Sequence, residues 1–360
     1  MLFRKRVPTS ENLVKHATVK RILVIKWSAM GDVALASAAI EDIRIAFPEA
    51  EIDLNTLPPW HQLYQSDPRF TYVHSYPLRA KELRERFGAS INWLKTVAAR
   101  RYDLVIDLQT TDRSRLMIGL LPLFGGGVRY RAGNKPAWPY NLAPQYTGGA
   151  RHALDLARDT MGAAGIEGAT KVPILHYDAQ ERAEADALMV ARTLEKNNFA
   201  VLLPGSQAGG WLKRWGAKNY ADCARRLLSS HVKQVVIIGG PDETEECENI
   251  RRLAGDTRVL NLCGQTKPMH IPLICSQAKC IVGNDTGTAH LAAAALRPMV
   301  VVCGPTDPRR VRPAGDHVIT VQLDIPCKNC YAKTCAHHSC MNLLKVDTVI
   351  DALSPQLDGA

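Results

Sequence analysis

Short apolar runs alternate along the chain with longer segments in which apolar residues recur at helical spacing. Such runs, rich in Val, Ile and Leu, are typical of strands buried on both faces of a parallel sheet. We expect strands at 21–26, 51–57, 70–76, 102–109, 199–205, 233–240, 258–264, 279–285 and 298–303, and a short strand within 123–134. We expect helices at 32–47, 89–101, 152–165, 179–196, 217–229, 243–254, 269–278, 288–296 and 346–353. This alternation predicts an α/β fold.

The alternation runs twice, and this predicts two Rossmann-like halves that face a central cleft. Residues 1–20 read as a loose basic leader, 21–175 as the N-terminal domain, and 176–345 as the C-terminal domain. The last segment, 346–360, is expected to form a helix that could pack back on the first half.

The net charge of +10 favours an acidic partner: nucleic acid, an anionic membrane surface or a phosphorylated substrate. A merely basic surface is the alternative. No zinc-finger, RRM or KH signature accompanies the basic clusters, so we expect no nucleic-acid partner. No apolar run approaches the roughly 20 residues of a membrane span, and the N-terminus has no signal-peptide core. We therefore expect a cytoplasmic protein.

Two strand–turn–helix segments place polar residues where a parallel sheet binds ligands. In the first, 26–32, Asp32 could be the general base for a sugar hydroxyl, or only an acid stabilised by the helix dipole. In the second, 284–290, Asp285 could bind sugar hydroxyls while backbone N–H groups hold a phosphate. His290, in the same segment, is more readily a hydrogen-bonded packing residue than a catalyst.

Two further turns carry groups that suit a nucleotide. The loop 204–215 combines glycines with Ser206, Lys213 and Arg214, a set that suits a pyrophosphate, although a flexible surface loop is the alternative. The turn 239–243 offers carboxylates for ribose hydroxyls, or simply charge at a helix start. The chain has no D-x-D pair, so a leaving diphosphate would be neutralised by helix dipoles and Lys or Arg.

Four of the ten cysteines are grouped near the C-terminus: Cys327, Cys330, Cys335 and Cys340. Their spacing suits a tetrahedral thiolate site for zinc or iron, with His337 and His338 as spare ligands. A site closed by four thiolates would be structural. Reduced unligated thiols and disulfides are the alternatives.

At this point the chain resembles a known family. The segments 30–33, 101–109, 213–215, 285–291 and 304–308, in this order and spacing, are similar to those of glycosyltransferase family 9, the ADP-heptose:lipopolysaccharide heptosyltransferases. The resemblance covers about residues 20–350 and implies a GT-B fold. It implies inverting, metal-independent transfer of heptose from ADP-heptose to an anionic acceptor of the lipopolysaccharide inner core, with no catalytic cofactor.

The resemblance also implies roles for individual residues. Asp32 would deprotonate the acceptor, and Lys213 would offset the charge of the departing ADP. The donor would be bound by residues of three turns: Ser206, Asp242, Glu243, Asp285, Thr286, Gly287, Thr288 and His290. The acceptor would be bound by Gly31, Arg113 and Arg115. The leader and the cysteine cluster depart from the best-known members.

Two alternatives remain open. A family member could use another nucleotide sugar or a protein acceptor, because sugar identity depends on the shape of the pocket. A catalytically silent nucleotide- or glycan-binding protein could share the scaffold.

The basic surface fits peripheral association with the cytoplasmic face of the inner membrane.

Overall fold

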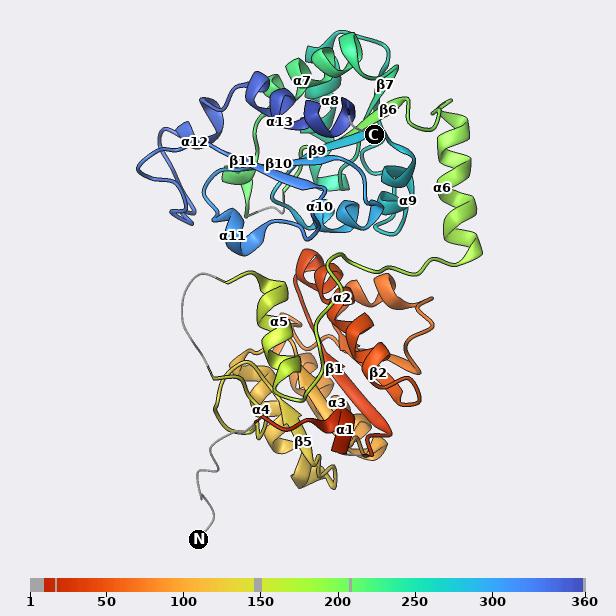
Figure 1. Cartoon of the computed structure of the whole chain (residues 1–360), viewed down its shortest axis with the longest axis vertical. Helices are drawn as coiled ribbons and strands as arrows, with labels where there is room; N and C mark the ends of the chain where they lie inside the picture. Colours follow the sequence, from red (N-terminus) through yellow and green to blue (C-terminus); the bar gives the residue numbers. More distant parts are fainter. Residues whose placement is uncertain (1–9, 17, 146–150, 207–208, 359–360) are drawn as a thin grey trace. The chain divides into compact units, whose positions relative to one another are not determined.

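The structure is a computed structural model that describes residues 10–16, 18–145, 151–206 and 209–358. The chain divides into two compact units, Met1–His176 and Tyr177–Ala360 (Figure 1). Each unit is a parallel sheet with helices packed against it, so the predicted α/β class is confirmed.

The first unit contains a sheet of five parallel strands in the order β3-β2-β1-β4-β5. Its strands are β1 (Arg21–Ile25), β2 (Glu51–Thr56), β3 (Tyr72–Ser75), β4 (Leu104–Asp107) and β5 (Tyr130–Ala132). Its helices are α1 (Leu13–His16), α2 (Met30–Ala46), α3 (Leu83–Arg100), α4 (Asp112–Leu120) and α5 (Ala153–Gly162), with the 3₁₀ helices η1 (Trp60–Tyr64) and η2 (Leu121–Phe124).

The second unit contains six parallel strands in the order β11-β10-β9-β6-β7-β8. Its strands are β6 (Phe199–Leu203), β7 (Gln234–Ile237), β8 (Val259–Asn261), β9 (Cys280–Asn284), β10 (Met299–Cys303) and β11 (Val318–Gln322). Its helices are α6 (Ala179–Ala191), α7 (Ala217–Ser230), α8 (Thr244–Ala254), α9 (His270–Gln277), α10 (Gly287–Ala292), α11 (Pro308–Val311), α12 (Ser339–Asn342) and α13 (Val346–Asp358), with η3 (Trp211–Lys213), η4 (Pro241–Glu243) and η5 (Ala293–Ala295).

Both sheets have the Rossmann strand order. Counted within its own unit, each runs 3-2-1-4-5, and the second adds a sixth strand. The order reverses between β1 and β4 in the first unit and between β6 and β9 in the second. Ligands of such sheets bind beyond the carboxyl ends of the strands at these reversals. Each unit therefore has one favoured place for a site.

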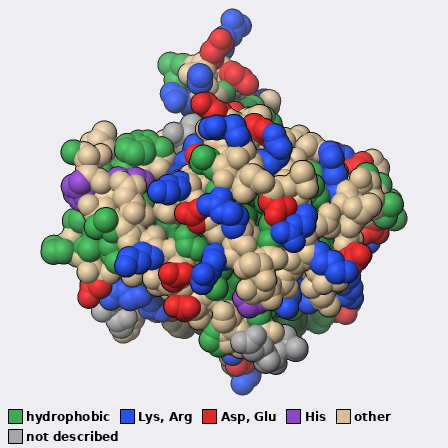
Figure 2. All heavy atoms as spheres, turned by 90° about the horizontal axis from the view of Figure 1, so that it is seen from above, with side chains coloured by type: hydrophobic (Ala, Val, Ile, Leu, Met, Phe, Trp, Pro, Cys, Tyr) green, Lys and Arg blue, Asp and Glu red, His purple; other side chains and the backbone are tan. Residues whose placement is uncertain are grey.

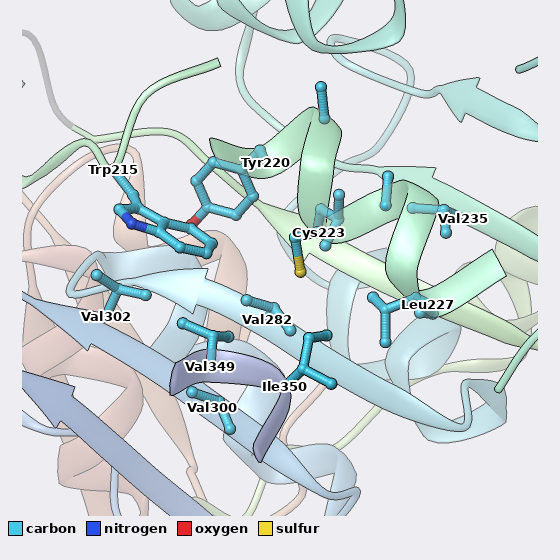
Figure 3. Close-up of a cluster of buried hydrophobic side chains, with 14 of the residues drawn as sticks. Trp215, Tyr220, Cys223, Leu227, Val235, Val282, Val300, Val302, Val349 and Ile350 are labelled. Carbon is cyan, nitrogen blue, oxygen red and sulfur yellow. The ribbon is translucent and has the colours of Figure 1, made fainter. Parts of the chain in front are cut away.

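The central strands of the second unit are buried along their whole length because helices cover both faces of the sheet. Figure 3 shows one of these covered faces, where Trp215 and Tyr220 pack against apolar side chains of the strands and of α13. The indole N–H of Trp215 donates to the Leu344 carbonyl (3.0 Å), which joins the loop before α7 to the segment before α13.

Segments near both chain ends pack within one of the two units. The leader was expected to be loose, but Leu13 is fully buried, and the backbone N–H groups of Glu11 and Leu13 donate to residues Ala163 and Ala164. Its first nine residues lie outside the described residues. The helix of 346–360 was expected to be able to pack on the first half, but Val349, Ile350 and other apolar residues of α13 lie in the core of the second unit. The apolar stripe of α13 is covered there by α7, β10 and β11.

Basic side chains are mixed with acidic ones on one face of the molecule (Figure 2). On the face in Figure 2, Lys and Arg side chains are interspersed with Asp and Glu rather than gathered in one tract. Among the described residues, no helix combines the length and apolarity needed to cross a membrane.

Candidate functional site

Asp32 lies at the strand reversal of the first unit, in the first turn of α2 directly after β1. The carboxylate is partly buried, and its Oδ2 accepts a long hydrogen bond from the Ala29 N–H (3.4 Å). This contact caps the helix, as expected for an acid at a helix start. It is a single weak bond, so the carboxylate is still able to accept a proton from a ligand.

The turn that carries Asp32 is held by Gln109, which follows the neighbouring strand β4. The Gln109 side-chain oxygen accepts hydrogen bonds from the N–H groups of Trp27 (2.9 Å) and Ser28 (3.2 Å). Gln109 is itself fixed, because its N–H donates to Asp107 Oδ1 (2.9 Å). The position of Asp32 thus depends on the pairing of β1 with β4.

Buried charges lie beneath this turn. Asp107 is fully buried at the end of β4 and accepts a hydrogen bond from the Tyr140 hydroxyl (2.6 Å). Burial raises the pKa of the Asp107 carboxyl. Burial also lowers the pKa of the Lys26 ammonium, while the charges of Asp32 and Asp107 oppose that shift. The Lys26 side chain therefore lies within electrostatic reach of the candidate base.

A group of arginines without carboxylate partners lies in the same unit. Arg113 donates to Ser90 Oγ of α3 (3.2 Å), and burial together with the charges of Arg86 and Arg79 lowers the pKa of its guanidinium. Within the described part of the chain, none of these three arginines forms an ion pair. Keeping like charges together is unfavourable unless an anion joins them. Arg115 differs, since it is paired with Asp112 (3.0 Å) and donates to the Trp138 carbonyl.

In the second unit, an ion pair connects Lys213, which follows β6, with Asp285, which follows β9; the strand order reverses between these two strands. Lys213 Nζ lies 2.7 Å from Asp285 Oδ2, which also accepts a hydrogen bond from the Thr306 hydroxyl (2.8 Å). The Asp285 side chain is only 5% exposed, whereas that of Lys213 is 28% exposed. The ammonium therefore remains accessible while a buried carboxylate holds it. Asp285 is thus placed to orient Lys213 as well as to meet a ligand.

The turn between β9 and α10, which carries Asp285, contains several more of the predicted site residues. Thr286 caps α10 by accepting a hydrogen bond from the Ala289 N–H, and Gly287 and Thr288 are partly exposed beside it. His290 is buried in α10, in keeping with a packing role. Asn284 ties the turn to the β6 loop, because its Nδ2 donates to the carbonyls of Pro204 and Gly205.

The loop after β6 and the turn after β7 contact each other through Glu243. The Glu243 carboxylate accepts hydrogen bonds from the N–H groups of Gly240 (2.8 Å) and Ser206, and burial raises its pKa. A Cβ at residue 205 would lie 1.8 Å from this carboxylate, so any other residue there would displace the Glu243 side chain. Ser206 Oγ accepts from Arg214 Nε (3.1 Å). Asp242 is instead exposed, beside a hollow of about 470 Å³.

The sequence analysis left several contributors to these sites unassigned: Lys26, Arg79, Arg86, Gln109, Asn284 and Thr306. Gln109 and Asn284 are neutral amides, and only the strand order shows that they meet a neighbouring turn. Arg79 and Arg86 precede Arg113 by more than 25 residues, and nothing in the sequence placed them beside it.

The four clustered cysteines lie in the segment between β11 and α13. Burial, followed by the charges of Cys327, Cys330 and Cys335, raises the pKa of the Cys340 thiol, so these three thiols lie within electrostatic reach of Cys340. The Cys335 sulfur accepts a hydrogen bond from the His338 N–H (3.3 Å). Even so, the described residues contain no set of three or more His, Cys, Asp or Glu side chains positioned to hold a metal ion.

The two histidines of this segment are engaged elsewhere. The His338 ring nitrogen Nε2 lies 2.7 Å from the Leu212 carbonyl, and the ring packs edge-on against Trp211. His337 Nδ1 lies 2.9 Å from Ser339 Oγ. Neither ring is directed to the thiols by a contact in this structure. The thiols alone are the better candidate ligands.

Comparison with known proteins gives consistent results. The sequence pattern of Glycosyltransferase family 9 (heptosyltransferase) matches residues 91–341. Lipopolysaccharide heptosyltransferase 2 of Salmonella typhimurium is 26% identical over 328 residues, covering 84% of this chain and 88% of that protein. Two solved structures share the fold. A family 9 glycosyltransferase from Veillonella parvula is 18% identical, with a TM-score of 0.79 over 98% of this chain and 99% of its own. E. coli heptosyltransferase WaaC with ADP is 21% identical, with a TM-score of 0.70 over 93% and 99%.

Proposed function

Because the chain belongs to glycosyltransferase family 9, the heptosyltransferases, we propose that it moves heptose from ADP-heptose to an anionic acceptor of the lipopolysaccharide inner core. The observation that carries the proposal is the Lys213–Asp285 pair at the strand reversal of the second unit. It offers a fixed, accessible cation to a departing diphosphate, which is the charge development that such a reaction must stabilise.

The reaction is a single displacement. Asp32 takes the proton of the acceptor hydroxyl as its oxygen attacks the anomeric carbon of heptose, and the bond from that carbon to the diphosphate breaks. ADP leaves with the bonding electron pair, and Lys213 offsets its added charge. One displacement from the opposite side inverts the anomeric centre. Because a lysine supplies the positive charge, no metal takes part in the transfer.

The donor is held by the edge of the second sheet. Thr286, Gly287 and Thr288 present partly exposed hydroxyl and backbone groups for heptose and diphosphate, and Ser206 lies on the facing loop. For the ribose, we favour Glu243 over Asp242, because Glu243 is fixed by backbone N–H groups next to Ser206.

The acceptor is recognised through its negative charge. Arg79, Arg86 and Arg113, which form no ion pair with any described residue, bring guanidinium groups together in the unit that carries Asp32. Guanidinium groups bind phosphate and carboxylate through directed pairs of hydrogen bonds. Gly31, which precedes Asp32 in the first turn of α2, is buried. Arg115 is already paired and contributes less.

A thermal-shift panel of ADP, UDP, GDP, CMP and an ADP-sugar tests the donor. A ligand present at about 100 times its dissociation constant stabilises a protein by about 2.7 kcal/mol. We expect selective stabilisation by ADP and the ADP-sugar. A preference for UDP or GDP would overturn the donor, and no response to any nucleotide would favour a silent scaffold.

Replacement of Gln109 tests the support of the base. Gln109→Met removes both acceptor contacts to the turn, and we expect kcat to fall by roughly tenfold to a hundredfold, because small displacements of a reacting group are costly. Gln109→Glu keeps an acceptor oxygen at this position and should retain more of the rate. Steady-state kinetics with ADP affinity as the control separates these effects. Equal rates for Gln109→Met and wild type would contradict the role.

We also propose that the four cysteines bind one structural zinc or iron ion, which would tie the loop before α12 to the second unit. Four thiols in one short segment, with a backbone N–H already donated to Cys335, match a thiolate site in ligand type and number. Elemental analysis of the purified protein should find about one metal per chain. The Cys327→Ser/Cys330→Ser variant should lose it, whereas Cys263→Ser, outside the cluster, should not. Four freely titrating thiols in metal-free wild type would refute the site.

A further inference from the structure

The apolar face of α3 extends beyond the core that it covers. Its second half buries residues Trp93, Leu94 and Val97 in the first unit. Phe87 lies seven residues, or about two helical turns, before Leu94, and Leu83 lies twice that distance before Val97, so both share that face. Yet Leu83 is 69% exposed and Phe87 is 67% exposed. The first two turns of α3 therefore present an uncovered apolar stripe within the described unit.

Basic side chains flank this stripe. Arg79, Lys81 and Arg84 are exposed, and Arg86 is partly exposed. Within the described residues none of these four forms an ion pair, so their charge is not cancelled by a fixed partner. The segment also contains Glu82 and Glu85, which leaves it basic overall. An apolar stripe between unpaired basic side chains is the pattern of helices that lie in the interface of an anionic membrane.

The stripe is placed next to the proposed acceptor groups. α3 follows β3, so its first turns lie at the carboxyl edge of the sheet, the edge that also carries Asp32. Arg113 reaches α3 at Ser90, one helical turn after Phe87 (3.2 Å). An acceptor bound by the arginines would therefore emerge beside Leu83 and Phe87.

We propose that Leu83 and Phe87, with Arg79, Lys81 and Arg84, dock this protein on a bilayer that contains anionic phospholipid. The proposal rests on the proposed function in one respect: a lipopolysaccharide acceptor carries a lipid, so the enzyme meets it at a membrane. The apolar side chains enter the headgroup boundary, and each basic side chain near the surface strengthens binding about fivefold. Docking then presents the acceptor-binding edge to the membrane.

Sedimentation of the full-length protein with vesicles tests the surface. We expect binding to vesicles of phosphatidylcholine mixed with phosphatidylglycerol, and at least tenfold weaker binding to phosphatidylcholine alone or at raised salt. Leu83→Ser/Phe87→Ser should lose at least tenfold in the partition coefficient. The matched control Val190→Ser/Leu253→Ser removes exposed apolar residues of the second unit and should bind as wild type does. Thermal melts establish that both variants fold.

Equal binding of wild type and Leu83→Ser/Phe87→Ser to the anionic vesicles would overturn the proposal, as would absence of binding by wild type. Light scattering that shows a wild-type dimer and a monomeric variant would assign the stripe to a second copy of the chain. Transfer to a soluble, delipidated acceptor separates the two proposals. If Leu83→Ser/Phe87→Ser transfers heptose to the soluble acceptor normally but no longer binds vesicles, the docking proposal is supported. If wild type binds vesicles but transfers no heptose, the proposed function is wrong and the docking proposal stands.

Discussion

Asp32→Asn is expected to lower the rate of heptose transfer by about 10²–10⁴-fold, the usual contribution of a general base. Asparagine has the same shape, and its oxygen is able to accept the capping hydrogen bond from the Ala29 N–H, but it cannot take a proton from the acceptor. The fold should survive, since a carboxylate in the first turn of a helix contributes at most about 1 kcal/mol at an accessible site. ADP affinity should not change, because the residues proposed for ADP lie in the other unit.

Asp112→Asn is the matched control. Asp112 also lies in the first turn of a helix in the same unit, but its side chain is almost fully exposed and pairs with Arg115. Transfer rates, measured as ADP release with donor and acceptor saturating, should stay near wild type for this control. If Asp32→Asn kept more than a tenth of the wild-type rate, Asp32 would be a capping residue and the base would lie elsewhere.

The central strands were predictable because burial on both faces makes them continuous apolar runs. β9 and β10 are examples, and both were expected near their observed bounds. β11 was missed: it is an edge strand, and most of its residues are only partly buried, so no apolar run marks it. The start of α3 was placed at residue 89 instead of 83 for a related reason, since its first two turns are charged and lie beyond the core. The helix α4 was not expected at all.

The candidate site also has residues that local sequence identifies and contacts that it does not. Asp32 and Asp285 stood out because each follows a clear strand and turn, so their positions at the sheet edge came from local sequence. Their contacts did not: Gln109 was not singled out, and the sequence named Lys213 without pairing it with Asp285, because both contacts join strand neighbours distant in the chain. The contact of Lys213 with Asp285 spans 72 residues and depends on β6 lying beside β9. Sequence patterns report the type of an element well, but such pairings follow from topology.

Removing Lys213 should have two separable effects. Lys213→Met leaves the Asp285 carboxylate buried with only the Thr306 hydroxyl as a side-chain donor, and an unpaired buried charge costs about 3–5 kcal/mol. We expect the lower part of that range, because the Lys213 side chain is 28% exposed. Transfer should fall by about 10²–10³-fold, the usual cost of losing one group that stabilises developing charge.

The double variant Lys213→Met/Asp285→Asn separates stability from catalysis. Without the carboxylate there is no unpaired buried charge, so denaturant unfolding should recover most of the lost stability, while transfer should remain as low as in the single variant. Lys218→Met, an exposed lysine at the start of α7, serves as the control for loss of a lysine. Recovery of transfer in the double variant would mean that Lys213 acts only by balancing the charge of Asp285. Unchanged stability of the single variant would mean that the ion pair contributes nothing to the free energy of folding. Lost transfer with restored stability would leave neutralisation of the departing diphosphate as the role of Lys213.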